Sequence, residues 1–491
     1  MKRTLLSIWL AGGLLRFGSF LLSENAGGDA LARVSLTAQW LQHPCLQVHF
    51  GVWLPLHFWL IGAASLLVGD VELAGRVVSL IFGVLSVGVV AWLTDELAGE
   101  QAALFSTIVF SFYSLHIAYS ATSSSDVPYM FLALTGLALF FRWRNVQSNW
   151  LLLYAGIALT CAAGFRYEAW ILIFGLILIL VYRRTWWGLA IFAPASGAFP
   201  LFWAAYEWHA RGNPLYAPAL NHSLVTEQLH GQTASLLYRL ALPAVVVAVT
   251  LTPIAVVGAL RSLRLLQRNG SSLAAEFLAL FLFFASVEML QITTGGVMSF
   301  ARYTLSLGSM IAVLSGIGLQ RSALRPRALT AIMCANLLLL SALSLIQTRF
   351  EDKARSVSPV LHFRRYLDDA GGFLKAHLKE GEAVVLDSYN DESNELAWRA
   401  GFPLIPNSRE FIVSDSGDRK AQASMIASLV PFIQAQHPAY VVFSPQGELS
   451  SFISLPAGCT KIQLADSDFE CVFDNSEYQI YKAAPTYGRR R

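Results

Sequence analysis

Charged residues are scarce in this chain of 491 residues. They make up 14% of it, against about a quarter in a typical soluble domain, while hydrophobic residues make up 55%. The shortage is uneven: up to about residue 347 the charges stand in short clusters between long apolar runs, and from residue 349 onward the composition is that of an ordinary globular domain. This pattern excludes a wholly soluble protein and predicts a membrane domain over residues 1–350, followed by a soluble domain over residues 351–491.

Cysteine and the common nucleotide and catalytic motifs are scarce as well. The five cysteines show no metal-ligand spacing, and the chain contains no Walker loop, no strand-associated GxGxxG and no GxSxG. The sequence therefore requires no cofactor, and a divalent metal, although compatible with it, has no motif in support. A net charge of only +3 argues against a nucleic-acid partner. Cys459 and Cys471 are either a disulfide in an extracytoplasmic domain or two buried thiols.

Apolar runs predict a polytopic α-helical membrane protein with about eleven transmembrane helices. A helix that crosses a bilayer needs roughly 20 apolar residues. Candidate runs cover residues 5–22, 72–93, 102–119, 127–141, 150–165, 170–182, 187–206, 240–260, 273–292, 305–319 and 329–346. No small-residue cleavage site directly follows the apolar core of the first run, so we interpret it as a retained helix and not as a signal peptide.

The distribution of arginines orients these helices. A further apolar stretch, residues 52–69, either spans the membrane or lies at its interface. If it lies at the interface, the alternation of spans puts Lys2 and Arg3 on the same side as the arginine clusters at 142–144, 183–184, 261–268 and 321–327. Basic loops are typically cytoplasmic. We therefore predict a first extracytoplasmic loop over about residues 23–71, with two helices that lie on or dip into the membrane.

The same alternation gathers polar residues at the extracytoplasmic surface. It places there Asp29, the turns at residues 123–126 and 166–168, the segment 300–303 and the whole C-terminal domain. Polar groups that are costly in lipid usually line a cavity or a pathway. This surface is therefore where we expect the chemistry.

Each candidate residue on this surface also has a purely structural interpretation. Asp29 either caps the helix that follows it or acts as a general base, and Asp126 either caps the next span or supports the reaction. His57 belongs to a segment, Trp53-Leu54-Pro55-Leu56-His57, that is typical of an aromatic membrane anchor. These interpretations remain open at the level of single residues.

The remaining candidates are charged groups close to the hydrocarbon. Arg166 and Glu168 either neutralise each other in a hairpin turn or contribute to a site. Arg302, which precedes Tyr303, is either an interfacial arginine or a phosphate ligand, for which its guanidinium geometry is well suited. Glu288 lies within the ninth span, near the same face, and either pairs with one of these arginines or supports the site.

The order of these segments along the chain resembles the GT-C superfamily of membrane glycosyltransferases. The acid after the first helix is followed by W-x-P-L, AGRVVSLIFGVLSVG, AYSATSSSDVPYMFLAL, GFRYEAWIL, GNPLY and FARYTLSL. The resemblance covers roughly residues 1–320. It is closest to the family 39-like branch of protein O-mannosyltransferases and bacterial lipid A aminoarabinose transferases. Many members carry paired acids in the first loop, whereas Gly28 and Ala30 flank Asp29 here.

The resemblance implies a transferase that moves a hexosyl or pentosyl group, with inversion, from a polyprenyl-phosphate sugar to an extracytoplasmic lipid, glycan or protein. It implies that Asp29 and Asp126 are the catalytic acids and that Arg302 and Tyr303, with Arg166, bind the donor phosphate. Glu168, His57 and Glu288 then have supporting roles. Membrane lipids are expected as further partners of the protein. A bacterial inner membrane fits this family, with the active site on the periplasmic side.

The C-terminal residues predict a small α/β domain. Helices are expected near residues 360–378, 392–400 and 420–434, and strands near 382–388, 440–444, 471–475 and 478–483. Asp387, Asn390, Asp391 and Glu392 follow the first strand and form either a solvated turn or a ligand site.

Other classes of protein are compatible with the composition. A transporter typically shows repeated halves with charges at the bilayer midplane, which this chain lacks. A polyprenyl-linked glycan ligase or polymerase uses the same donors, but its large loop is expected late in the chain. A non-catalytic scaffold would not explain why Asp29, Asp126 and Arg302 lie on one side of the membrane.

Overall fold

The computed structural model describes residues 2–25, 28–44, 53–222, 236–268, 273–294, 301–345, 360–362, 365–379, 382–386, 392–401, 408–410, 429, 431, 433–435, 437–444, 458–464, 467–475 and 477–484. The chain divides into two compact units. The helical unit comprises residues 1–25, 45–225 and 234–363, and the α/β unit comprises residues 26–44, 226–233 and 364–491. The α/β unit thus includes a segment of the predicted first loop as well as the C-terminal part of the chain.

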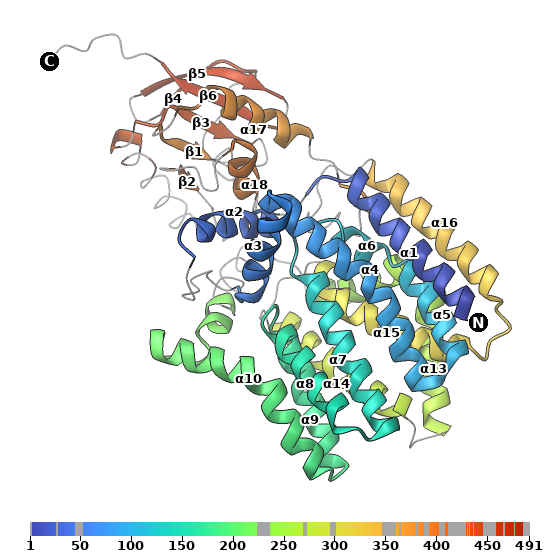
Figure 1. Cartoon of the computed structure of the whole chain (residues 1–491). Coiled ribbons are helices and arrows are strands. Elements are labelled where there is room, and N and C mark those ends of the chain that lie inside the picture. Colours follow the sequence, from blue (N-terminus) through green and yellow to red (C-terminus); the bar gives the residue numbers. More distant parts are fainter. Residues whose placement is uncertain are drawn as a thin grey trace. The chain divides into compact units, whose positions relative to one another are not determined.

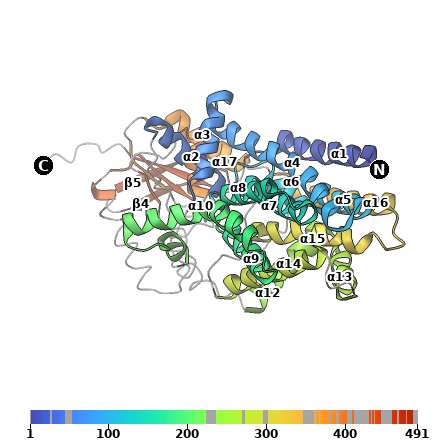
Figure 2. The same cartoon turned by 60° about the horizontal axis from the view of Figure 1, so that its bottom comes forward.

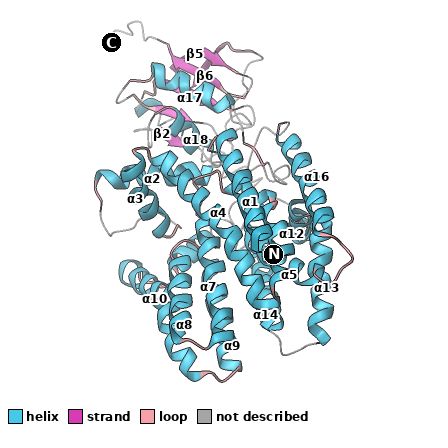
Figure 3. Ribbon diagram, turned by 45° about the vertical axis from the view of Figure 1, so that its right-hand side comes forward, coloured by secondary structure: helices cyan, strands magenta, loops and turns pink. Residues whose placement is uncertain are grey.

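Helices are the main elements of the first unit (Figure 3). They are α1 (Lys2–Leu22), α3 (Leu56–Val68), α4 (Val71–Ala98), α5 (Glu100–Ser111), α6 (Ser114–Tyr119), α7 (Asp126–Val146), α8 (Asn149–Ala163), α9 (Glu168–Tyr182), α10 (Trp186–Arg211), α12 (Leu236–Leu251), α13 (Pro253–Arg268), α14 (Leu273–Thr294), the 3₁₀ helix η1 (Ala301–Thr304), α15 (Leu305–Leu319) and α16 (Pro326–Ser344).

Six of the described helical segments are long and apolar enough to cross a membrane: α1, α4, α10, α14, η1 with α15, and α16. A seventh results if α12 and α13 form one bent span. Helices α3, α8 and α9 are apolar but have only 13, 15 and 15 residues. At 1.5 Å per residue they extend about 20–23 Å, less than the roughly 30 Å hydrocarbon core. The length of α3 agrees with an interfacial position, while the count of eleven spans stays a prediction.

The predicted span over residues 102–119 is interrupted between Ser111 and Ser114, where α5 ends and α6 begins. A buried arginine from the middle of α1, Arg16, lies at this break. Its guanidinium donates to the carbonyl oxygens of Ser111 at 3.2 Å and Phe110 at 3.1 Å. Carbonyls at a helix end lack partners within the helix, and lipid offers none. The prediction of a continuous helix is therefore wrong here. The side chain of Arg16, which is distant in the sequence, donates the hydrogen bonds that the carbonyl groups at the end of α5 lack.

The predicted span over residues 240–260 is broken too. Helix α12 ends at Leu251, α13 begins at Pro253, and the two axes differ by 109°. Thr252 between them has a positive φ of 72°, and proline has no N–H to continue the hydrogen-bond ladder. A single straight span is therefore wrong for this segment as well.

Helix α15 lies deepest in the helical unit, with 89% of its span buried. Small residues permit its close packing: a Cβ on Gly316 would lie 2.7 Å from the Ser106 side chain of α5, and one on Gly258 of α13 would lie 3.1 Å from the Ser315 carbonyl. Close approach through small residues is typical of helices packed within membranes. Because η1 leads directly into α15, this packing fixes where the side chains of η1 lie.

The α/β unit contains α2 (Gly28–Gln42), α17 (Arg365–His377), α18 (Glu392–Arg399) and a six-stranded sheet, shown in Figure 1. The strands are β1 (Val384–Leu386), β2 (Ser408–Glu410), β3 (Tyr440–Phe443), β4 (Lys461–Leu464), β5 (Ser467–Asp474) and β6 (Gln479–Ala483), in the order β2-β1-β3-β6-β5-β4. Pairing is parallel for β2-β1-β3 and antiparallel for the rest. Side chains alternate between the faces: Val384 and Leu386 pack with α17 and α18, and Val385 packs on the other side.

The predicted α/β character of this unit is confirmed, although β2 and β4 were not predicted. Asp387, Asn390 and Asp391 lie outside the described residues, as does most of the helix predicted at 420–434, while Glu392 is the first residue of α18. Cys459 and Cys471 form a disulfide with Cα atoms 5.2 Å apart. Of the two interpretations of this cysteine pair, the structure therefore supports the disulfide.

Candidate functional site

Two neighbouring helices bring Asp126 and Arg166 together. Helices α7 and α8 run side by side (Figures 1 and 2) and are joined by a short turn, so the start of α7 lies beside the end of α8. Asp126 is the first residue of α7, and Arg166 follows α8. Their side chains form an ion pair, with Arg166 Nη1 2.6 Å from Asp126 Oδ1. This contact joins residues that are 40 positions apart in the sequence.

Asp126 does not use its carboxylate to cap α7. The N-cap residue is Ser125, which makes no side-chain cap hydrogen bond. The second carboxylate oxygen, Oδ2, accepts from the hydroxyl of Ser124, whose oxygen in turn accepts from the Asp126 backbone N–H at 3.2 Å. Both oxygens are thus held by neighbouring groups, and the carboxylate has a fixed orientation. Asp126 is therefore not the N-cap residue of α7, and its role in the reaction stays a prediction.

Arg166 is shared between two carboxylates. Its Nη2 lies 2.6 Å from Glu168 Oε1, and its Nε donates to the same oxygen at 2.9 Å. Burial alone would lower the pKa of Arg166, but the charges of Asp126 and Glu168 outweigh it and raise this pKa above its usual value. The guanidinium therefore keeps its charge. The predicted pairing of Arg166 with Glu168 is confirmed, and Asp126 is a second partner that the sequence did not indicate.

Tyr303 connects this cluster to the second arginine. The Arg166 guanidinium lies 5.4 Å from the centre of the Tyr303 ring, and the Arg302 guanidinium lies 5.3 Å from the same centre. Both distances are within the range of cation–π attraction. Arg302 is 8% exposed. Arg166 and Arg302, which come from distant segments, therefore both contact Tyr303 of η1.

Glu288 adds a third carboxylate to the same region. Its side chain is 1% exposed on α14, close enough to Glu168 and Arg166 to interact with both electrostatically. Within the described part of the chain its Oε1 has no hydrogen-bond partner, and no ion pair with an arginine is found there. The predicted pairing of Glu288 with an arginine is therefore not observed. The cluster combines Asp126, Glu168 and Glu288 around Arg166.

His57 lies behind the Arg166 turn. It is fully buried in the first turn of α3, and its ring centre is 6.0 Å from that of Phe165. The neighbouring backbone N–H of Leu56 donates to the carbonyl of Gly164 at 3.2 Å. The start of α3 is thus attached to the loop that carries Arg166, and the supporting role of His57 stays a prediction.

Comparisons with known proteins show which fold the chain has. Residues 43–204 match the family model of dolichyl-phosphate-mannose-protein mannosyltransferases. The structure of ArnT from Cupriavidus metallidurans bound to undecaprenyl phosphate is similar with a TM-score of 0.64 at 13% identity, over 99% of both chains. A search of curated protein sequences gives no match. At this identity the structural similarity shows the fold of the chain, which is that of the GT-C membrane glycosyltransferases.

An archaeal oligosaccharyltransferase has a similar fold. The Archaeoglobus fulgidus oligosaccharyltransferase with Zn and sulfate has a TM-score of 0.58 at 13% identity, over 90% of this chain and 68% of that one. Its complex with an inhibitory peptide and a dolichol-phosphate has a TM-score of 0.53 at 13% identity, over 90% and 69%. The predicted fold class, a helical GT-C membrane protein with a C-terminal α/β domain, is confirmed at this level.

Asp29, the predicted base, lies in the first turn of α2 within the α/β unit. Helix α2 already begins at Gly28, so Asp29 is a residue of the helix and not its cap. A negative charge in a first turn is stabilised by the helix dipole, typically by about 0.3–1 kcal/mol. Its catalytic role stays a prediction. Across the described residues, no three His, Cys, Asp or Glu side chains are arranged to hold a metal ion.

Sequence reasoning missed two residues that hold the Asp126 turn in this GT-C fold. Asn25 accepts from the Ser123 N–H at 2.9 Å and donates to the Ser123 hydroxyl at 3.1 Å. Arg76 donates to the carbonyls of Ala121 at 2.8 Å and Ser23 at 2.7 Å. The position of Arg76, a charged residue inside an apolar run, could have indicated that it has a partner within the protein. The serine-rich turn before Asp126 is therefore fixed from both α1 and α4.

Proposed function

We propose that this protein transfers a sugar from a polyprenyl-phosphate donor to an extracytoplasmic lipid, glycan or protein. The observation that carries the proposal is the convergence of Arg166 and Arg302 on Tyr303 beside three carboxylates, in a GT-C fold. The Cupriavidus metallidurans and Archaeoglobus fulgidus proteins, which have this fold, were solved with undecaprenyl phosphate and dolichol-phosphate. Both ligands join a phosphate to a long polyprenyl chain.

The chemistry needs one base and one phosphate-binding group. The oxygen of an acceptor hydroxyl attacks the anomeric carbon of the donor, and the bond from that carbon to the phosphate oxygen breaks. The hydroxyl proton passes to a carboxylate, and polyprenyl phosphate leaves with the bonding electrons. In a single displacement of this kind the anomeric configuration inverts. Cations aimed at the departing phosphate stabilise the charge that develops on it.

We assign the base to Asp29 and the phosphate to Arg302 with Tyr303. Arg166 is the second choice because its guanidinium is already paired with Asp126 and Glu168. Asp126, with both oxygens held, is suited to orient Arg166 or the acceptor. Glu168, His57 and Glu288 support this arrangement. The polyprenyl chain occupies apolar surface between helices.

We further propose that the C-terminal domain, residues 351–491, lies on the extracytoplasmic side, in a bacterial inner membrane the periplasm. The Cys459–Cys471 disulfide supports this side, because disulfides persist in oxidising compartments. The arginine clusters at 142–144 and 183–184 support a cytoplasmic position for the other ends of the helices. With both features, the active-site loops and the domain share one side of the membrane.

The direct test is a transfer assay with the purified protein in lipid vesicles. The vesicles contain one of several polyprenyl-phosphate sugars, and released or transferred sugar is measured for each. We expect one donor to be consumed with release of polyprenyl phosphate. Movement of a donor across the bilayer without cleavage would favour a transporter, and the absence of cleavage for all donors would contradict the proposal.

Replacing Arg302 tests the phosphate assignment. Because a charge-assisted hydrogen bond is worth about 1.5–3 kcal/mol, Arg302→Ala should lower the apparent affinity for the donor roughly 10- to 150-fold and change that for the acceptor little. Arg302→Lys keeps the charge and should retain more donor affinity. Titration of donor and acceptor separately measures both effects. A larger loss for the acceptor than for the donor would contradict the assignment.

A further inference from the structure

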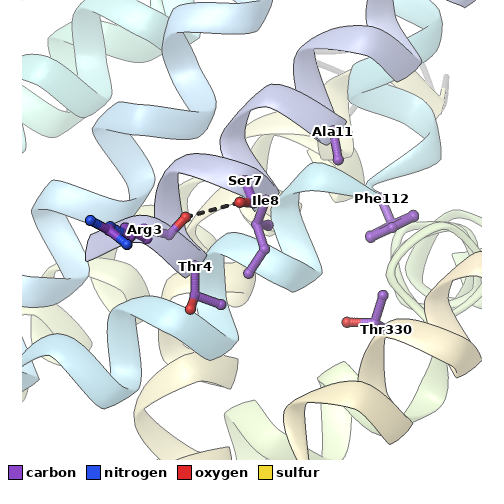
Figure 4. A pocket seen from close by; sticks show the side chains of 7 residues that line it. All are labelled: Arg3, Thr4, Ser7, Ile8, Ala11, Phe112 and Thr330. Atoms are coloured by element: carbon purple, nitrogen blue, oxygen red, sulfur yellow. Dashed lines mark hydrogen bonds between the residues drawn. The ribbon is translucent and has the colours of Figure 1, made fainter. Parts of the chain in front are cut away.

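A pocket of about 330 Å³ lies far from the carboxylate cluster. It is lined by one face of α1 from Arg3 to Ala11, by Phe112 after α5 and by Thr330 of α16. In Figure 4, Ile8 and Ala11 of α1 lie on the side of Phe112 and Thr330, while the Arg3 guanidinium extends outward at the other end of the lining. None of these residues takes part in the candidate site, so the pocket needs an explanation of its own.

The pocket and the candidate site lie at opposite ends of the helical unit. Helix α1 runs antiparallel to α4: the Trp9 indole donates to the Val84 carbonyl at 2.9 Å, and Arg76 donates to the Phe20 carbonyl. Arg3 is therefore at the end of α4 that carries Glu96. The Asp126 turn is at the other end, where Ser123 donates to the Glu72 carbonyl at 3.2 Å.

The lining of the pocket changes from polar to apolar along α1. Arg3 and Thr4 are at the terminal end, and Ile8, Ala11 and Phe112 line the part nearer the middle of the span. The Ser7 hydroxyl between them already donates to the Arg3 carbonyl at 3.0 Å, the contact drawn in Figure 4. A ligand with a charged head and a hydrocarbon chain matches this gradient.

The surface around the pocket faces lipid. Leu6, Leu10 and Leu14 of α1 are 54%, 52% and 70% exposed, on a helix long and apolar enough to cross a membrane. Leu338 and Leu339 of α16 are exposed as well. The small side chains of Ser7 and Ala11 line the pocket on the same helix as Leu6, Leu10 and Leu14. Such a pocket within a bilayer is filled by a hydrocarbon chain.

The charge at this end determines which lipid head fits. The sequence has no Asp or Glu from residue 1 to 23 and none from 289 to 350, while Arg325 and Arg327 flank the start of α16. Two of the carboxylates at the neighbouring helix ends are paired with arginines: Glu96 with Arg142, and Glu276 with both Arg144 and Arg183. Asp95 in the last turn of α4 and Glu100 at the start of α5 do not line the pocket. Arg3 at the pocket therefore favours an anionic head over a zwitterionic one.

We propose that this pocket binds an anionic phospholipid, with its phosphate at Arg3 and one acyl chain along Ile8, Ala11 and Phe112. The Arg3 guanidinium donates charge-assisted hydrogen bonds to the phosphate. The chain covers apolar surface between α1 and α16. The lipid is a bound ligand distinct from the proposed sugar donor, so this inference does not depend on the proposed activity.

The test compares lipids on the intact protein. The protein is purified in detergent, phosphatidylglycerol or phosphatidylcholine is titrated in, and bound lipid is counted by native mass spectrometry. We expect tighter binding of phosphatidylglycerol. Because a basic residue at a membrane surface contributes about 1 kcal/mol to the binding of acidic lipid, Arg3→Gln should weaken that binding about fivefold.

Two further variants separate charge from shape. Arg184→Gln removes an exposed arginine that precedes α10 at the same end of the unit, away from the pocket, and should leave binding unchanged. Ala11→Phe keeps every charge but fills the pocket, and should displace the acyl chain. The proposal is overturned by equal binding of the two lipids, or by equal losses in Arg3→Gln and Arg184→Gln. It is also overturned if Ala11→Phe, with its thermal unfolding unchanged, binds phosphatidylglycerol as well as the wild type does.

Discussion

Asp29→Asn is expected to lower sugar transfer by about 10²–10⁴-fold, the usual contribution of a general base. The substitution keeps the size of the side chain but removes its ability to accept a proton. The attraction of the Asp29 charge to the start of α2, which the substitution removes, is typically worth about 0.3–1 kcal/mol. Transfer rate with saturating donor, together with the amount of protein in the membrane, measures the effect.

Asp70→Asn is the matched control for Asp29. Asp70 belongs to the same predicted first loop, is exposed, and caps α4 by accepting from the Leu73 N–H at 2.6 Å. Asparagine caps helices about as well as aspartate, so this variant should keep its activity. If Asp29→Asn retains activity within a few-fold of the wild type, Asp29 is not the base. If both variants lose activity equally, the loop as a whole is responsible.

The membrane character of the chain could be predicted from its sequence, but the breaks in its spans could not. The length of an apolar run shows whether a segment can cross the lipid, and α4 and α14 lie at the residues where such runs predicted spans. At the break between α5 and α6, the exposed backbone carbonyls accept hydrogen bonds from Arg16, which is nearly 100 residues away and fully buried. The charge at position 16 within an apolar run was visible, but its partners were not.

The candidate site could be predicted in part for the same reason. Arg166 and Glu168 are two residues apart, so their ion pair follows from a single turn. Asp126 joins them only because α7 and α8 pack antiparallel, and Tyr303 only because η1 enters α15 beside them. The order of the motifs along the chain was enough to select these residues as candidates. Which of them touch depends on helix packing, which that order does not specify.

The second large effect is expected on stability, from Arg166→Gln. Arg166 is the cation between Asp126 and Glu168, and Glu288 is close by. Removing one member of a buried ion pair typically costs about 3–5 kcal/mol, because the remaining charge is left uncompensated. We therefore expect Arg166→Gln to unfold at a clearly lower temperature or denaturant concentration than the wild type, measured in the same detergent.

A double substitution distinguishes lost charge balance from lost packing. Arg166→Gln with Glu168→Gln removes one carboxylate together with the cation, so it should be more stable than Arg166→Gln alone. Arg142→Gln is the control, because its ion pair with Glu96 is 46% exposed on the arginine side and surface pairs are typically worth about 0–1 kcal/mol. If the double variant is less stable than the single one, Arg166 acts through packing. If Arg166→Gln costs no more than Arg142→Gln, the cluster does not stabilise the fold, and a role in binding becomes the reason for its charges.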